Sequence, residues 1–168
     1  VREGEDRVRE RFGASTFAQR RVQQAEDAVG RAAADLDAAR AALAVARGLG
    51  GPVTLVNRSA DRAAALLAEM QVAGTVQAPG TALPAAALLI NATSLGMTGQ
   101  PPLDIDLAPL APDACVFDCV YAPLDTPLLQ AARARGLTTI DGLSMLIGQA
   151  ASAFGLFYGA PAPRQFDA

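Results

Sequence analysis

Short apolar runs alternate with helical patterns from residue 52 to residue 158, and this alternation restricts the possible folds more than any other feature. The first run, PVTLVN, is rich in β-branched residues, and the segment after it, ADRAAALLAEM, has helical spacing. Repeated strand–helix order predicts an α/β protein with a mostly parallel sheet. The expected strands are 52–57, 75–78, 87–91, 115–121 and 137–141, and the expected helices are 60–70, 126–136 and 142–158.

A different pattern precedes these runs, because arginine, glutamate and aspartate dominate residues 1–37. Apolar residues spaced three and four apart predict one long helix from about Gln19 to Arg47, ended by the glycines of GLGG. Such a helix either lies flat on a sheet or forms a dimerising coil, and its many seam alanines favour the sheet. The predicted domain plan is a charged helical lead-in over 1–37, an α/β domain over 38–159 and a tail over 160–168.

The composition argues against several classes of function. A net charge of −3 and a pI near 4.9 give no support to a nucleic-acid surface. All 14 basic residues are arginine, so the chain has neither the histidine nor the lysine that commonly serve as general base and amine catalyst. On a strand, Cys115 and Cys119 would lie roughly 13 Å apart, too far for a disulfide. Two thiols without histidine also make a poor zinc site, so buried free cysteines in a reducing cytoplasm are the favoured interpretation.

The stretch from Gly142 to Pro163 carries no charge and is long enough to suggest a membrane span. Polar residues and glycines interrupt it, so a buried amphipathic helix is favoured instead. The N-terminus VREGEDRVRERF lacks the apolar region of a signal peptide. We therefore expect a cytoplasmic protein without membrane contact, in which the final helix packs on the sheet through Leu143, Leu146, Ile147, Ala150, Phe154 and Phe157.

Polar motifs follow four of the expected strands, at Asn57, Asn91, Tyr121 and Asp141. In an open parallel sheet, ligands bind beyond the carboxyl ends of the strands. Arg58 suits a ribose 2′-phosphate, because a guanidinium fork matches phosphate geometry, and Arg62 lies one helical turn further on. The alternative is a solvated arginine at a strand end.

The other motifs also have structural alternatives. The turn Asn91–Met97 offers hydroxyl groups and a glycine to a phosphate, a ribose or a nicotinamide edge, or it is an ordinary polar turn. Tyr121 places a phenol at the sheet edge. Met145 and Gln149 share one face of the final helix, where Gln149 has the donors and acceptor to orient a polyhydroxy acid. Taken one at a time, core packing is the favoured explanation of Met145, and simple exposure is that of Gln149.

Together, the motifs VNRSADRA, INATSLGM, VFDCVYAPLDTPLL and IDGLSMLIGQAA resemble the C-terminal NADP-binding domain of the shikimate dehydrogenase family, from about Ala38 to Gly159. The resemblance implies a Rossmann-like doubly wound parallel sheet and the reversible, NADPH-dependent reduction of 3-dehydroshikimate to shikimate, in the pathway to aromatic amino acids. The cofactor-binding residues that it implies are Asn57, Arg58, Ser59, Arg62, Thr93, Cys119, Gly142 and Met145, and the substrate-binding residues are Tyr121 and Gln149.

Two departures from this family are visible in the sequence. Family members have a strand and a Gly-Ala-Gly-Gly turn before an Ala-Ala-Arg-Ala helix start, and the cofactor pyrophosphate rests on that helix. Here Ala34-Asp35-Leu36-Asp37 occupies the glycine positions, so the sheet is expected to lack its first, central strand. The family also has an N-terminal substrate domain with a catalytic lysine and aspartate, and this chain has no lysine.

These departures predict a truncated chain that is inactive alone and binds NADP weakly, with residues 1–37 either a real replacement or the product of a frameshifted or mis-joined gene. Two alternatives remain open. One is a non-catalytic interaction module that partners a separate substrate domain or forms a homo-oligomer through its N-terminal helix. The other is an NADP(H)-sensing domain.

Overall fold

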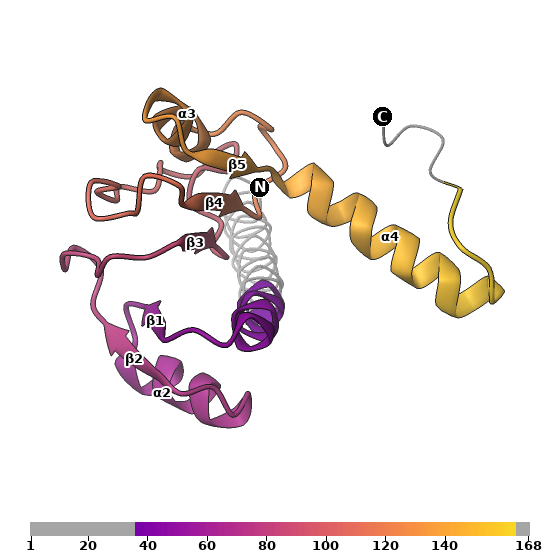
Figure 1. Ribbon diagram of the computed structural model, residues 1–168, viewed down its shortest axis with the longest axis horizontal. Helices are drawn as coiled ribbons and strands as arrows, with labels where there is room; N and C mark the ends of the chain where they lie inside the picture. Colours follow the sequence, from indigo (N-terminus) through magenta and orange to yellow (C-terminus); the bar gives the residue numbers. More distant parts are fainter. Residues whose placement is uncertain (1–35, 164–168) are drawn as a thin grey trace, which may run out of the picture. The chain divides into compact units, whose positions relative to one another are not determined.

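The computed structural model describes residues 36–163, and the chain divides into two units, Val1–Asp37 and Ala38–Ala168 (Figure 1). Most of the predicted lead-in, and the end of the predicted tail, lie outside the described residues. The second unit contains parallel strands joined by helices and loops, which confirms the α/β prediction.

The first sheet has two strands, β1 (Val53–Val56) and β2 (Gly74–Gln77), paired in parallel with Leu55 opposite Val76. The helix over residues 36–49 and α2 (Ala60–Glu69) share a small apolar core with these strands. Its buried residues are Leu43, Leu66 and Leu67. The helix over 36–49 ends as the sequence predicts, because Gly50 adopts a φ of +73° that side chains rarely accept.

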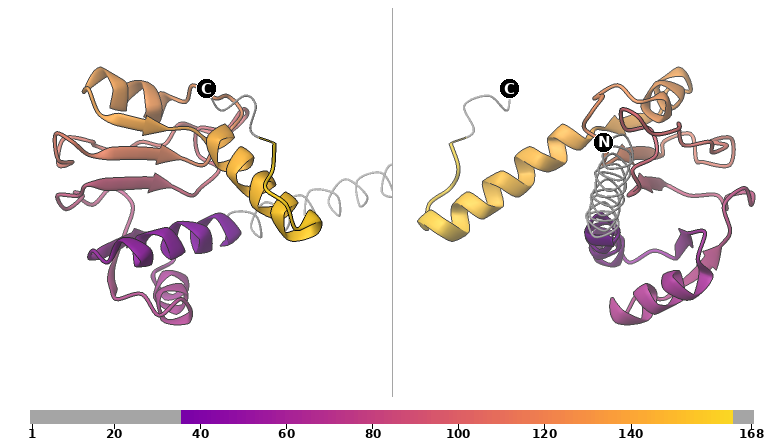
Figure 2. Two further views of the ribbon diagram at one scale, coloured as in Figure 1. Left: turned by 45° about the vertical axis from the view of Figure 1, so that its right-hand side comes forward. Right: turned by 180° about the vertical axis from the view of Figure 1, so that it is seen from behind.

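The second sheet has three parallel strands, β3 (Leu88–Asn91), β4 (Cys115–Asp118) and β5 (Thr138–Ile140), with β4 in the middle. The helix α3 (Pro127–Ala134) contacts β4 and β5 and lies beside them in Figures 1 and 2. This half has a larger core, which includes Val116 and Leu129 at 0% exposure. The remaining buried members of this core are Leu107, Leu110, Ala114, Leu128, Ala132 and Leu137.

The division into two sheets falls at one particular place in the strand order. Doubly wound dinucleotide-binding sheets have the order 3-2-1-4-5-6. The observed orders are β1-β2 and β3-β4-β5, which correspond to strands 2-3 and 4-5-6. Among residues 36–163 no strand precedes β1, so the sheet is interrupted where its first strand would lie. The described part of the chain therefore lacks the central strand, as the sequence predicts.

The final helix differs from its expected packing. The helix α4 (Gly142–Tyr158) was expected to bury an apolar stripe on the sheet, but Gly142 is its one buried residue among those described. Leu143 is 42% exposed, Ile147 45% and Phe157 84%. The prediction was wrong because an apolar stripe shows that a helix needs cover, not which surface supplies it. No helix within residues 36–163 has the length and apolar character to cross a membrane.

Candidate functional site at the carboxyl ends of the strands

The loop after β1 is held by hydrogen bonds of Asn57. Asn57 donates its backbone N–H to Gln77 O at 3.1 Å, and its side-chain Oδ1 accepts from the N–H of Ser59 at 2.9 Å. Ser59 is the N-cap of α2, as expected, but its side chain makes no capping hydrogen bond, because Asn57 instead organises the turn. Arg58 is thereby placed on an ordered turn at the start of a helix.

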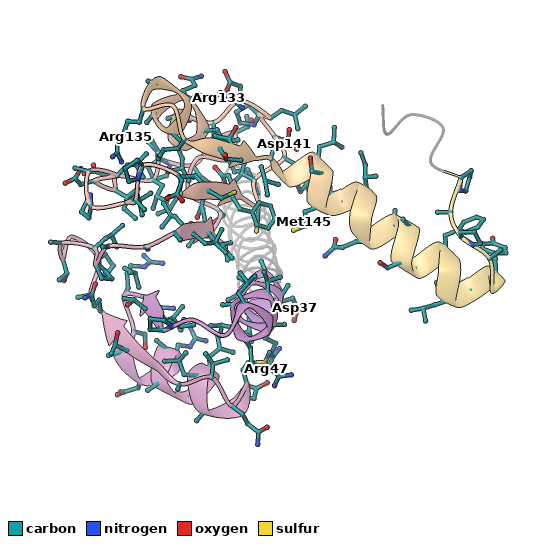
Figure 3. All side chains as sticks on the ribbon, in the orientation of Figure 1. Asp37, Arg47, Arg133, Arg135, Asp141 and Met145 are labelled. Atoms are coloured by element: carbon teal, nitrogen blue, oxygen red, sulfur yellow. The ribbon has the colours of Figure 1, made fainter. Side chains whose placement is uncertain are left out.

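The two arginines at the start of α2 are exposed, and their guanidinium groups are available to a ligand. Arg58 precedes α2, and Arg62 lies in the first turn of that helix. Within residues 36–163, neither guanidinium forms an ion pair or a side-chain hydrogen bond with another residue. Arg47 contrasts with them, since it donates to Met70 O at the far end of α2 at 3.2 Å (Figure 3). Two unpaired guanidinium groups beside a helix N-terminus can bind a phosphate group.

A buried polar network joins the ends of β3 and β4. Asp118, at 0% exposure, accepts from Asn91 Nδ2 at 2.9 Å, from the Val120 N–H at 3.0 Å and from Thr126 Oγ1 at 2.6 Å. Thr126 is also fully buried and caps α3 by accepting from the Leu129 N–H at 3.3 Å. Each partner therefore satisfies a group that would be costly to bury alone.

The same network extends into the turn that carries Thr93. The Oδ1 atom of Asn91 accepts from both the N–H and the hydroxyl group of Thr93, at 3.1 and 2.8 Å. The Asn91 Nδ2 atom also donates to Leu95 O at 3.0 Å, and the Thr93 hydroxyl accepts from the Leu95 N–H at 3.1 Å. The turn at Asn91–Met97 is consequently an ordered structure whose exposed Thr93 is held in place from beneath.

Tyr121 lies on the neighbouring loop and is 50% exposed. This loop is tied to the previous one, because Thr98 donates its N–H and its hydroxyl group to Ala122 O at 2.8 and 3.1 Å. Asp118 fixes the loop's start through Val120, and Thr126 fixes its end. The phenol of Tyr121 is therefore available to a ligand on an anchored loop.

Gly142 starts α4 in close contact with the loop after β4. A Cβ atom at this position would lie 2.5 Å from the carbonyl oxygens of both Cys119 and Val120. The position thus accepts only glycine, for a structural reason that the sequence did not reveal. Burial, together with the nearby Asp118 charge, raises the pKa of the Cys119 thiol to about 11. Both cysteines are free and half-buried, so the thiols are unpaired as predicted and less buried than expected.

Asp141 and Met145 lie at the start of α4, as Figure 3 shows. Asp141 caps this helix, because its Oδ1 accepts from the N–H and hydroxyl of Ser144, each at 2.9 Å. These hydrogen bonds lower the pKa of Asp141. Met145 is half-buried, and Gln149, one turn later, is exposed.

The structure thus separates the expected site residues into two groups. Asn57, Arg58, Ser59 and Arg62 follow β1 of the two-stranded sheet, whereas the others follow strands of the three-stranded sheet or lie on α4. Within residues 36–163, no hydrogen bond or ion pair joins the two groups. The interrupted position in the strand order lies between them.

Sequence reasoning missed the two residues that organise the second group, Asp118 and Thr126. One feature could have found Asp118, which is a carboxylate within the apolar run CVFDCVY. A charged residue inside a buried strand needs hydrogen-bond donors nearby, and Asn91 on the preceding strand is one. Thr126 could have been found as a threonine directly before Pro127, a typical helix start.

Most of the chain is similar in sequence to known proteins. It is 60% identical over 131 residues to "Shikimate dehydrogenase (NADP(+))" of Sphingopyxis alaskensis, covering 77% of this chain and 48% of that protein. The matched part of the chain belongs to the shikimate dehydrogenase family. No family model matches the chain.

Solved structures agree with this assignment. A shikimate 5-dehydrogenase from Thermus thermophilus, in complex with NADP(H) and shikimate, matches with a TM-score of 0.57 and 32% identity, over 70% of this chain and 44% of that one. A quinate dehydrogenase from Corynebacterium glutamicum, in complex with NAD, matches with a TM-score of 0.59 and 35% identity, over 64% and 41%. The fold is therefore Rossmann-like. The chain spans less than half the length of these shikimate dehydrogenase relatives.

Proposed function

We propose that this chain is the NADP-binding half of a shikimate dehydrogenase, whose complete form reduces 3-dehydroshikimate to shikimate with NADPH. The observation that carries the proposal is the 60% identity over 131 residues to an enzyme of that name. Arg58 and Arg62 support it, because two unpaired guanidinium groups suit a 2′-phosphate at a position where an NAD site would carry a carboxylate.

The residues present suit the two ends of the cofactor but not its middle. In this proposal Asn57, Arg58, Ser59 and Arg62 bind the adenosine 2′-phosphate, and Thr93, Cys119, Gly142 and Met145 line the nicotinamide end. Tyr121 and Gln149 reach the substrate. The pyrophosphate has no equivalent seat within residues 36–163, since Leu36 and Asp37 are already helical where a glycine turn is needed. When bound, NADPH supplies the hydride, and the protein's own residues only hold and orient it.

The chain alone is proposed to be catalytically inactive. Reduction of a carbonyl group needs a proton as well as a hydride, and this chain has no lysine or histidine to deliver one. The test is shikimate oxidation by the purified chain with NADP⁺, followed by NADPH absorbance. We expect no turnover, and an enzyme-like rate would contradict the inactivity while supporting the family reaction.

NADPH binding can be tested separately from turnover. Titration of NADPH by fluorescence compares the wild type with Arg58→Ala and with Arg47→Ala, which removes the same charge at the opposite end of α2. Loss of the hydrogen bonds from Arg58 to a charged phosphate is expected to weaken binding by about tenfold or more, or at least about 1.4 kcal/mol. Arg47→Ala is expected to leave the affinity unchanged. Equal affinities for wild type and Arg58→Ala would remove Arg58 from the site. Micromolar affinity would favour an NADP(H)-sensing role.

An interaction module that partners a separate substrate domain is the second candidate, and α4 favours it. No residue of Gly142–Tyr158 is charged, yet Leu156 is 88% exposed and Tyr158 72%. An exposed apolar helix of this length indicates a missing partner surface. The substrate domain is the proposed occupant, because the relatives are more than twice as long as the matched segment.

One substitution and one deletion test the interaction module. Leu156→Glu should abolish complex formation with the substrate domain of a relative in gel filtration, and an unchanged complex would contradict this role. A shortened chain without residues 1–37 tests the N-terminal helix. An unchanged oligomeric state of that chain would exclude the helix as a homo-oligomer element.

A cytoplasmic location is part of the proposal. Cys115 and Cys119 are both free thiols. Free thiols persist in reducing compartments. Fractionation of the source cells, with an antibody against the chain, would check the location.

A further inference from the structure

The strands β1 and β3 each leave one edge without a partner. In the first sheet β1 pairs with β2, and in the second β3 pairs with β4. Within residues 36–163 no strand pairs with the second edge of either. If one open position joins the edges of β1 and β3, the two observed orders match the doubly wound order with a single strand absent from residues 36–163.

The hydrogen bonds identify which residues of β1 face the open position. In a parallel strand, the N–H and C=O of one residue point to the same side, and alternate residues point to opposite sides. Asn57 bonds to Gln77 of β2, so Val53 and Leu55 face β2 as well. Thr54 and Val56 consequently direct their backbone groups away from β2.

The same reasoning applies to β3. Ala87 O and Asn91 O accept from Cys115 and Cys119, so the backbone groups of Leu89 also face β4. Leu88 and Ile90 therefore face the open position. Together with Thr54 and Val56 they present eight backbone donors and acceptors that have no backbone partner within residues 36–163. Such an edge is a template for an added strand.

We propose that the edges of β1 and β3 accept one parallel strand from a second polypeptide, of about four apolar β-branched residues followed by a glycine turn. The length matches the four residues of β1 and of β3. The apolar character follows because a strand between parallel neighbours is covered on both faces. This strand site stands on the sheet topology alone and does not need the proposed function.

The chain's own sequence directs the choice of a second polypeptide. A strand that pairs with β1 would normally lie directly before the helix over 36–49, as the first strand of a βαβ unit. The ten residues before Ala38 are AVGRAAADLD, with a single β-branched residue and three charges. That composition favours a helix. The relatives contain more than half their length outside the matched segment, which leaves ample length for such a strand in another polypeptide.

The glycine turn adds a consequence that rests on the proposed function. In dinucleotide-binding sheets, the turn after the first strand binds the pyrophosphate. A strand that carries this turn should therefore tighten NADPH binding, whereas a strand without it should not.

The test is amide hydrogen exchange of the full chain, measured by NMR, with a synthetic peptide as the strand. The peptide is Lys-Lys-Ala-Val-Val-Val-Ile-Gly-Ala-Gly-Gly, and its control has N-methyl groups on alternate strand residues, which block pairing. The expected result is slower exchange by about tenfold or more at Thr54, Val56, Leu88 and Ile90 with the peptide alone. Leu55 and Asn57, which face β2, are internal controls that should exchange slowly with and without peptide.

Three results would overturn the strand site. In the first, the amides of Thr54, Val56, Leu88 and Ile90 still exchange fast with saturating peptide. In the second, the N-methylated control slows their exchange as much as the peptide does. In the third, these amides already exchange slowly without peptide, which would mean that another segment of this chain or a second copy fills the position. NADPH titration with the peptide separates the two claims. Protection without tighter NADPH binding keeps the strand site and contradicts the proposed role of the glycine turn.

Discussion

The two halves of the sheet differ in how well they are buried. Around β4, Val116, Leu129 and Ala132 are 0% exposed, and eight buried residues form one core. Around β1, the buried core consists of Leu43, Leu66 and Leu67, and every residue of β1 is half-buried. The two-stranded sheet is thus the less completely covered half, although β1 and β3 both lack a neighbouring strand on one edge within residues 36–163.

The candidate site residues follow the same division. The residues on the well-buried half are held by the Asn91–Asp118–Thr126 network before any ligand arrives. Arg58 and Arg62 belong to the half with the smaller core. The substrate end of the proposed site is therefore pre-built, and the adenosine end depends on a smaller core.

The largest expected effect contrasts the two cores directly. Leu129→Ala should lower the free energy of unfolding by about 4 kcal/mol, and Leu67→Ala by about 2 kcal/mol, since the cost rises with the completeness of packing. Urea unfolding followed by circular dichroism measures both. Equal losses, or a larger loss for Leu67→Ala, would show that the first sheet is packed as well as the second.

Removal of Asp118 should have the next largest effect. Asp118→Ala leaves the Asn91 amide and the Thr126 hydroxyl without their buried partner, which should cost about 3 kcal/mol. Asp125→Ala is the matched control, because Asp125 forms an exposed ion pair with Arg133 that is expected to contribute little to stability. Similar losses for the two aspartates in thermal unfolding would contradict a special role for Asp118.

The sequence predicted the strands well because each is a short apolar run bounded by turn residues. It also placed Asn57, Asn91 and Asp141 correctly at the strand ends, since these positions follow from the strand boundaries. The exposure of α4 could not be predicted, because an apolar helix does not identify its partner. The pairing of Asp118 with Thr126 depends on a loop conformation that brings residues eight apart together.

A substitution at Gly142 should have an intermediate effect on the second half. Gly142→Ala places a methyl group 2.5 Å from two carbonyl oxygens, so α4 must shift from the loop after β4, at a cost of about 2 kcal/mol. Gly148→Ala is the control on the same helix, where nothing lies within 4 Å. It should stabilise the helix by up to about 1 kcal/mol. Opposite signs in thermal unfolding are expected, and a neutral Gly142→Ala would contradict the close contact.

The smallest effect concerns the cap of α4, outside both cores. Hydrogen bonds from Ser144 lower the pKa of Asp141 in the folded state. The resulting stability is present above the unfolded pKa of about 3.9 and is lost as the pH falls through the lower folded value. Asp141→Asn keeps the cap and removes the titration, so it should change stability at pH 7 by less than about 0.5 kcal/mol. Thermal unfolding between pH 6 and about pH 2.5 should then show a shallower acid loss for Asp141→Asn than for wild type. Parallel curves would mean that Asp141 does not contribute.

The exposed loop after β1 is the proposed seat of the 2′-phosphate, and the contrast between the two halves of the site depends on it. Calorimetric titration with adenosine 2′,5′-bisphosphate and with 5′-AMP, which differ only in that phosphate, tests it without requiring the pyrophosphate seat. Wild type should bind the bisphosphate at least about tenfold more tightly, and Arg58→Ala should lose this preference. Equal affinity of the wild type for the two nucleotides would contradict the account.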